Sequence, residues 1–222
     1  MSILYTILIY PLELFIKLIL ENAYALLHNY GLSLVAVSIV ISFILLPLYQ
    51  LADRLQKKDK EIRAAMQPQI DDIKKAYSGY QRHLYIKALY RQYGYHPLST
   101  LKASLGLVIQ IPFLLAAFNL ISSYEALQGT SFLFINDLSR PDRLLSLGGV
   151  TVNFLPILMT LVNFGASYFY AKDLPRSEGL QMVLIALVFL VILYGAPSGL
   201  LVFWTCNNIF SLIKYFILYL KR

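Results

Sequence analysis

Long apolar runs without charge alternate with charged stretches along the chain. A helix needs about 20 predominantly apolar residues to cross roughly 30 Å of hydrocarbon. Five runs approach or exceed this length, and only the last holds a charge, Lys214, which lies near enough to its end to reach the interface. The pattern predicts membrane spans at 31–51, 105–124, 150–171, 180–196 and 199–219. Between the last two, Ala196-Pro197-Ser198-Gly199 predicts a tight reversal.

Residues 1–30 are also apolar, but three charged residues recur at intervals of four. Glu13, Lys17 and Glu21 therefore share one face of a helix. This placement favours an amphipathic helix lying in the membrane interface over a sixth span. An uncleaved signal-like anchor is the alternative, and the absence of a basic n-region and an A-x-A site weakens it. Pro11 is expected in the first turn of this helix or at a kink.

The charged segment 52–104 keeps apolar residues at helical spacing, which predicts two antiparallel helices. Ser78-Gly79 supplies the turn between them. We expect the first helix to be broken or kinked near Gln67-Pro68 and the second to end at Gly94. Its basic side chains form a solvated face, or contact anionic headgroups, ribosomal RNA or a nascent chain. The candidates for such contacts are Lys57, Lys58, Lys60, Arg63, Lys74 and Lys75.

The distribution of Lys and Arg predicts the orientation. Basic residues exceed acidic ones in 52–104, whereas 125–149 is slightly acidic. By the positive-inside rule, the hairpin 52–104 is cytoplasmic and the loop 125–149 is external. The N-terminus is then outside, while the loop 172–179 and a short basic tail, 220–222, are cytoplasmic.

Composition narrows the class of protein. Of 222 residues, 58% are hydrophobic and only 14% are charged, although the net charge is +7. A soluble domain carries about 25% charged residues, so a soluble enzyme is nearly excluded. The single cysteine, Cys206, excludes an intrachain disulfide and a cysteine-cluster metal site.

Polar side chains inside the predicted spans are the best candidates for function, because they are costly in lipid unless they are paired or hydrated. Several share a helical face, which predicts that these faces line a hydrated cavity. The alternative is hydrogen bonding between packed helices. The candidate groove-lining residues are Ser38, Ser42, Gln110, Asn153, Asn163, Trp204, Asn207 and Asn208.

Covalent chemistry has no candidates in the predicted spans. They contain no Asp, Glu, His or Arg, and their only Lys is terminal. Acid–base catalysis, Ser-Lys dyads and metal coordination all need such groups. We therefore expect a protein that is not an enzyme and has no cofactor and no metal.

Short motifs in a fixed order resemble the YidC/Oxa/Alb family of membrane protein insertases, and the resemblance covers nearly the whole chain. Each motif is weak alone, but their order and spacing together are specific. They are Tyr10-Pro-Leu-Glu13, Asn29-Tyr-Gly31, Leu46-Pro47-Leu48, Met66-Gln-Pro68, Ile73-Lys-Lys-Ala-Tyr77, Leu89-Tyr90, His96-Pro97-Leu98, Ile109-Gln-Ile-Pro112, Asp137-Leu-Ser139, Phe154-Leu-Pro-Ile-Leu158, and Ala196-Pro-Ser-Gly-Leu200 through Trp204 to Asn208.

The resemblance implies an all-α polytopic membrane protein with five spans around a hydrophilic groove. The groove would be open to the cytoplasm and lipid, closed outside, and covered by a mobile cytoplasmic hairpin. Its function would be to receive hydrophilic segments of nascent membrane proteins and release their apolar helices into the bilayer. The Sec translocon and the ribosome are candidate partners, no sequence-specific nucleic acid is expected, and a bacterial cytoplasmic (inner) membrane is the expected location.

One position departs from the family pattern. The family usually has an arginine in the first span, five residues before the proline that matches Pro47, and this chain has Ser42 there. The resemblance then allows a groove that works through hydration alone. Two alternatives remain open: a specialised paralogue with restricted clients, and a small polar-groove transporter or channel.

Overall fold

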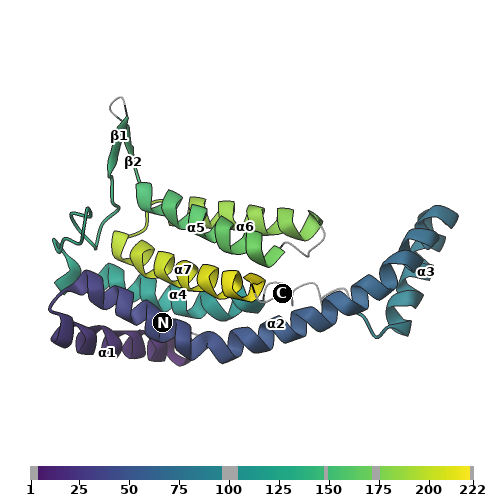
Figure 1. The fold of residues 1–222 in the computed structure, drawn as a ribbon, viewed down its shortest axis with the longest axis horizontal. Helices are drawn as coiled ribbons and strands as arrows, with labels where there is room; N and C mark the ends of the chain where they lie inside the picture. The colour runs from purple at the N-terminus through teal and green to yellow at the C-terminus, as the bar shows by residue number, and fades with distance from the viewer. Residues whose placement is uncertain (1–4, 97–104, 148–149, 172–175, 221–222) are drawn as a thin grey trace. The chain divides into compact units, whose positions relative to one another are not determined.

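A computed structural model of the chain describes residues 5–96, 105–147, 150–171 and 176–220, and most of them are helical (Figure 1). The chain divides into two compact units. The first comprises Met1–Ile44 and Pro112–Arg222, and the second comprises Leu45–Ile111. Two helices, α2 (Tyr30–Ala76) and α4 (Leu105–Ser123), contribute residues to both units.

The first unit begins with a short π-helix, Tyr5–Ile9, followed by α1 (Tyr10–Leu27). Pro11 lies in the first turn of α1, where its missing N–H removes no helical hydrogen bond. His28 ends the helix in a left-handed conformation with φ of 49°. Asn29 then caps α2, because its Oδ1 accepts a 3.0 Å hydrogen bond from the Leu32 N–H. The predicted N-terminal helix is confirmed, and its place in the interface stays a prediction.

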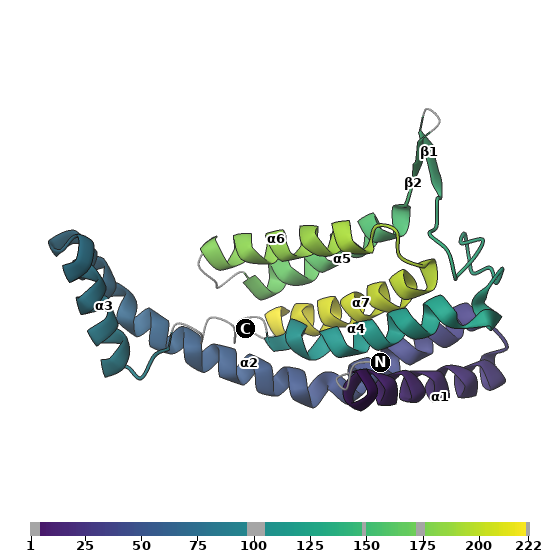
Figure 2. The same cartoon turned by 180° about the vertical axis from the view of Figure 1, so that it is seen from behind.

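The remaining helices of the first unit are α5 (Phe154–Ala171), α6 (Arg176–Leu193) and α7 (Ser198–Leu220). Helix α5 packs against both α6 and α7, as the two opposite views in Figures 1 and 2 show. Met159 of α5 and Phe203 of α7 are fully buried, whereas α6 leaves Leu184, Val188 and Val191 exposed. A helix that exposes one apolar face while burying the other suits a lipid environment.

Two helices are long and apolar enough to cross a membrane, namely α2 and, in α7, the stretch Ser198–Ile217. The three other helices that overlap predicted spans carry shorter apolar stretches within the described ranges. These are Val108–Ser123 in α4, Phe154–Phe169 in α5 and Met182–Leu193 in α6. Each predicted span thus overlaps a helix, and the count of five membrane crossings stays a prediction.

The start of the third predicted span is wrong. Val150–Val152 forms strand β2, which pairs antiparallel with β1 (Leu145–Leu147), and α5 begins only at Phe154. All three residues of β2, Val150, Thr151 and Val152, are β-branched, which explains the difference, because such side chains fit a strand at least as well as a helix. The apolar character of these residues alone does not distinguish a strand from a helix.

The second unit contains the predicted helical hairpin. Helix α2 continues to Ala76, and α3 (Gly79–Gln92) follows after a turn in which Gly79 has φ of +54°. Met66 and Ile70 of α2 pack against Leu89 of α3. Of the break or kink expected near Pro68, the break is absent, because α2 runs through that proline, and the kink stays a prediction. Packing of Met66 and Ile70 on either side holds the helix together despite one lost backbone hydrogen bond.

Other boundaries shift by a few residues. Helix α3 ends two residues before Gly94, which has the left-handed φ of +58° that glycine favours. Helix α6 starts at Arg176, inside the predicted loop 172–179. Residues 97–104 of the hairpin segment, 172–175 of that loop and 221–222 of the tail lie outside the described residues.

Gly31 is a position where no side chain fits. A Cβ added there would lie 2.0 Å from the ring of Phe132. We therefore expect Gly31→Ala to destabilise the purified protein by about 1–3 kcal/mol, measured by thermal unfolding in detergent, because the ring or the helix must move. Gly165→Ala is the matched control, since its Cβ would make an ordinary contact 3.5 Å from Leu212. Equal stability of the two variants would contradict this account.

Candidate functional site

A hydrogen bond between two predicted groove residues joins α2 to α7. The Ser42 hydroxyl donates a 2.6 Å hydrogen bond to Asn207 Oδ1, and Asn207 Nδ2 donates to the Phe203 carbonyl at 3.1 Å. Ser42 is only 3% exposed. The ring of Phe43, the residue after Ser42, meets the ring of Phe210, one turn after Asn207, edge to face with centroids 5.3 Å apart. Ser42, which stands where the resemblance implies an arginine, therefore takes part in helix packing.

Three other polar atoms of α7 are buried and lack a hydrogen-bond partner within the part of the chain that the structure describes. They are Trp204 Nε1, Thr205 Oγ1 and Asn208 Nδ2. The Trp204 ring stacks on Phe189 of α6 at a centroid distance of 5.8 Å, which fixes the indole. Two of these atoms are obligatory donors, and an unsatisfied buried donor costs about 1–3 kcal/mol. A hydrogen bond to water or to a polar ligand would remove that cost.

The polar residues of α5 bond locally. Thr160 Oγ1 donates to the Pro156 carbonyl at 2.8 Å, and the Ser167 hydroxyl lies 3.4 Å from Asn163 Oδ1. In α2, Ser38 is buried and likewise donates to its own helix, at the Val35 carbonyl. Gln110 is half-buried in the portion of α4 that belongs to the second unit. Among the predicted groove residues, the structure joins only Ser42 and Asn207 by a direct bond between helices.

Asn153 lies in a different setting, in the connection between β2 and α5. Its Oδ1 accepts from the Arg143 N–H at 3.1 Å, and its Nδ2 donates to the Tyr194 carbonyl at 2.7 Å. Next to it, Asp142 Oδ2 accepts the N–H groups of Phe154 and Leu155 at 2.6 and 3.2 Å and so caps α5. Asp142 therefore secures the start of α5, and Asn153 ties the residue before α5 to the connection between α6 and α7.

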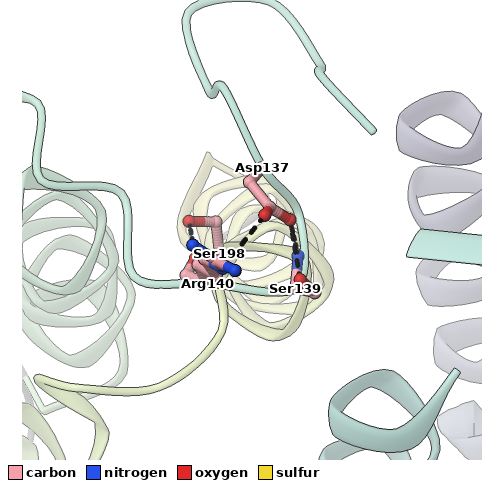
Figure 3. Close-up of polar contacts among 4 residues, drawn as sticks. All are labelled: Asp137, Ser139, Arg140 and Ser198. Atoms are coloured by element: carbon pink, nitrogen blue, oxygen red, sulfur yellow. Dashed lines mark hydrogen bonds and ion pairs between the residues drawn. The ribbon is translucent and has the colours of Figure 1, made fainter. Parts of the chain in front are cut away.

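A second set of contacts holds the start of α7. The carbonyl of Arg140 accepts hydrogen bonds from both the N–H and the hydroxyl of Ser198, at 2.8 and 2.6 Å. The carbonyl of Leu138 accepts from the Gly199 N–H at 2.8 Å. Figure 3 shows the Arg140–Ser198 contact beside Asp137 and Ser139. We call these three bonds, from residues 138–140 to Ser198 and Gly199, the α7 latch.

The latch leaves no space around Gly199. A Cβ there would approach the Leu138 carbonyl oxygen to 3.0 Å, and Leu34 of α2 and Ile121 of α4 to 3.1 and 3.2 Å. Glycine at this position thus allows α2, α4, α7 and the loop to converge on one point. Packed side chains and backbone bonds therefore fill the space around the start of α7.

Asp137 organises the loop side of the latch. Its Oδ1 accepts from the Ser139 N–H and hydroxyl at 2.8 and 2.7 Å, and its Oδ2 lies 3.4 Å from the Arg140 guanidinium. Burial alone would raise the pKa of Asp137, but the bonds from Ser139 and from the Gly129 backbone, with the Arg140 charge, lower it below its ordinary value. Asp137 is therefore ionised at neutral pH and holds the turn.

The basic residues of the hairpin are distributed along exposed helix surface. Lys57 and Lys58 are exposed, while Lys74 and Lys75 lie 3.9 Å from Asp71 and Asp72. Arg63 pairs with Asp59 at 2.9 Å and lies over the Tyr95 ring. The side chain of Lys60 is outside the described part of the chain. Local acids thus balance several of these charges, and contact with a partner stays a prediction.

Sequence reasoning missed two features of the site. Thr205 was not among the candidates, although it precedes the predicted Asn207 and Asn208 in the same polar run. The hydrogen bonds of the α7 latch were also not predicted. Its signals were present as two separate motifs, Asp137-Leu-Ser139 and Ala196-Pro-Ser-Gly-Leu200, but nothing in the sequence links them.

The fold and the buried polar helix faces define the class as a helical integral membrane protein. Within the described ranges, no group of three or more His, Cys, Asp or Glu residues is placed to hold a metal ion.

Comparison with known proteins identifies the family. Residues 22–222 match the family model described as 60Kd inner membrane protein. A membrane protein insertase YidC from Fusobacterium nucleatum is 31% identical over 214 residues, which cover 93% of this chain and 95% of that protein. The chain therefore belongs to this family, the YidC/Oxa/Alb membrane protein insertases, and to a bacterial inner membrane.

Other relatives are longer. The membrane protein insertase YidC from Treponema denticola is 30% identical over 223 residues, which cover 94% of this chain but only 37% of that protein. A crystal structure of an active YidC insertase with its first transmembrane domain resolved has a TM-score of 0.60 and 24% identity, covering 99% of this chain and 47% of that one. The chain thus shares its fold with about half of the solved protein.

Removal of the bond between α2 and α7 tests its contribution to stability. Ser42→Ala leaves Asn207 Oδ1 buried without its donor, so we expect a loss of roughly 1 kcal/mol in the free energy of unfolding. The measurement is thermal or denaturant unfolding in detergent. Ser33→Ala is the control, because Ser33 is equally buried but donates to Asn29 within the same segment. A Ser42→Ala protein as stable as Ser33→Ala would refute a packing role for this bond.

Proposed function

We propose that this protein is a membrane protein insertase and chaperone. It receives hydrophilic segments of nascent membrane proteins in a groove open to the cytoplasm and releases their apolar helices into lipid. The observation that carries the proposal is the set of buried, unpaired polar atoms on α7, at Trp204, Thr205 and Asn208. In a bilayer such groups need water or a polar ligand, and a hydrated groove supplies both.

The α7 latch supports the closed outer end of this groove. In the proposed topology five helices span the membrane, with the loop 125–149 outside and the hairpin on the cytoplasmic side. The latch, the Asp142 cap and the Asn153 bonds then all lie at the outer end. Water and polar segments would enter from the cytoplasmic end only.

The energetic benefit lies in a shorter path through hydrocarbon. Moving an unpaired polar backbone group into an apolar medium costs several kcal/mol, and partial hydration lowers that cost. The groove contains no arginine at Ser42, so hydration and neutral hydrogen bonds carry the effect. In the first unit, Trp204, Thr205 and Asn208 supply the unpaired polar atoms of the proposed lining. Ser38, Ser42, Asn163 and Asn207 complete it with polar groups that already bond within the protein.

Partners follow from the same function. Nascent membrane proteins are the proposed clients, the bilayer is the proposed acceptor of their helices, and the Sec translocon and ribosome are candidate partners. The exposed Lys57 and Lys58 are the hairpin residues best placed for contact with a nascent chain. No covalent step and no cofactor are needed for this function.

Insertion by the purified protein in liposomes tests the proposal. We expect insertion of a one-span or two-span client with a short translocated tail above the level of empty vesicles. Asn208→Leu should reduce it by about 5-fold, equivalent to roughly 1 kcal/mol, because one hydrated group is lost. The same substitution should not lower the stability of the protein, since it removes a buried amide nitrogen that has no partner.

Ile209→Leu, at the exposed neighbouring position of α7, is the matched control and should insert the client normally. If the liposomes conduct a small solute but insert no client, the insertase proposal is wrong and the transporter alternative is favoured. Unchanged insertion of the client by Asn208→Leu would show that Asn208 does not line the groove.

A further inference from the structure

A tight turn in the loop before the latch displays two large apolar side chains. Leu133 is 80% exposed and Phe134 is 51% exposed. No charged residue occurs from Ala126 to Asn136. We call residues 132–135 the apolar tip. An exposed apolar cluster on an ordered loop marks an interaction site.

The backbone holds the tip in one conformation. Phe132 and Ile135 exchange hydrogen bonds, N–H to carbonyl, at 2.9 and 2.8 Å, and the Leu138 N–H closes the loop on the Thr130 carbonyl at 2.9 Å. Leu133 has φ of 53°, a region that bulky side chains rarely adopt. The turn therefore presents Leu133 outward by a specific geometry, and its paired backbone groups suit a medium poor in water.

The inner side of the tip is anchored at the start of α2. The Phe132 ring occupies the place that a side chain at Gly31 would fill, and Ile135 is only 2% exposed. The tip thus lies beside the first turn of α2, where the predicted span 31–51 begins. That contact fixes the position of the tip relative to the start of α2.

Tyrosines gather at the same end of the helices. The Tyr30 ring stacks on Tyr24 at a centroid distance of 3.9 Å and meets Tyr124 edge to face at 6.1 Å. The Tyr124 hydroxyl also donates to Glu21 Oε1 at 3.2 Å. Tyrosine is enriched where the membrane meets water, so this cluster favours a place for the start of α2 at the interface.

We propose that the apolar tip inserts Leu133 and Phe134 into the lipid interface next to the start of α2 and anchors the loop to the bilayer. Lipid is the occupant that the position favours, since the tip is uncharged and lies beside an interfacial tyrosine cluster. The proposal rests on α2 crossing the membrane and does not depend on insertase activity.

The anchor would act on the α7 latch through the chain. Leu138 and Arg140 follow the tip within a few residues, and their carbonyls hold Ser198 and Gly199. A tip held in lipid restrains the loop against the helix ends. The lipid contact would thus help to hold the loop against the start of α7.

Depth-dependent fluorescence quenching tests the proposal on the full chain in liposomes. Cys206→Ala removes the native thiol, and Leu133→Cys provides a single site for an environment-sensitive nitrobenzoxadiazole label. Phospholipids with a nitroxide near the headgroup should quench this label at least threefold more than a label at Asp72→Cys. The Asp72 side chain is 80% exposed on the hairpin and serves as the aqueous control. Aqueous iodide should show the opposite order.

Equal quenching at both sites would overturn the proposal. A label at residue 133 that is shielded from both iodide and nitroxide lipid would also overturn it, because a protein contact would then cover the tip. Phe134→Ser provides a second variant, and it should halve the lipid quenching at residue 133. Client insertion measured in the same liposomes reports separately on the proposed function, since an inactive protein with a lipid-quenched tip would refute only the insertase.

Discussion

The structure depends on how the first turn of α7 is held. The N–H groups that open a helix have no partners inside it, and burying them unpaired would be costly. Here the Leu138 and Arg140 carbonyls accept the N–H groups of Gly199 and Ser198. Gly199 lets Leu34 and Ile121 approach the same point. One loop therefore fixes the helix that carries three of the candidate groove residues, Trp204, Asn207 and Asn208.

From that fixed end, α7 distributes its polar residues in two ways. Asn207 bonds to Ser42 and joins α7 to α2, whereas Trp204, Thr205 and Asn208 keep polar atoms without partners in the described part of the chain. The first arrangement is stable in lipid without help, and the second needs water or a polar ligand. The contrast explains how one helix both packs the bundle and offers polar groups to a client in the proposed function.

Much of this fold could be predicted from apolar run length and charge, because a span and an amphipathic hairpin each leave a clear pattern. These patterns predicted spans that all overlap helices of the structure. They also predicted the turn at Ser78-Gly79. The error at Val150 arose because a short strand of β-branched residues is as apolar as a helix. Pairings such as Ser42 with Asn207, 165 positions apart, leave no local signal and needed the three-dimensional structure.

The central claim is that the polar groups of α7 are hydrated from the cytoplasmic side and sealed at the latch end. The most direct test is thiol labelling of Asn208→Cys in a Cys206→Ala background with a membrane-impermeant maleimide, comparing inverted and right-side-out vesicles. The account predicts labelling in inverted vesicles, where the cytoplasmic side faces the reagent, and little in right-side-out ones. Absence of labelling from the cytoplasmic side, or equal labelling from both sides, would contradict it.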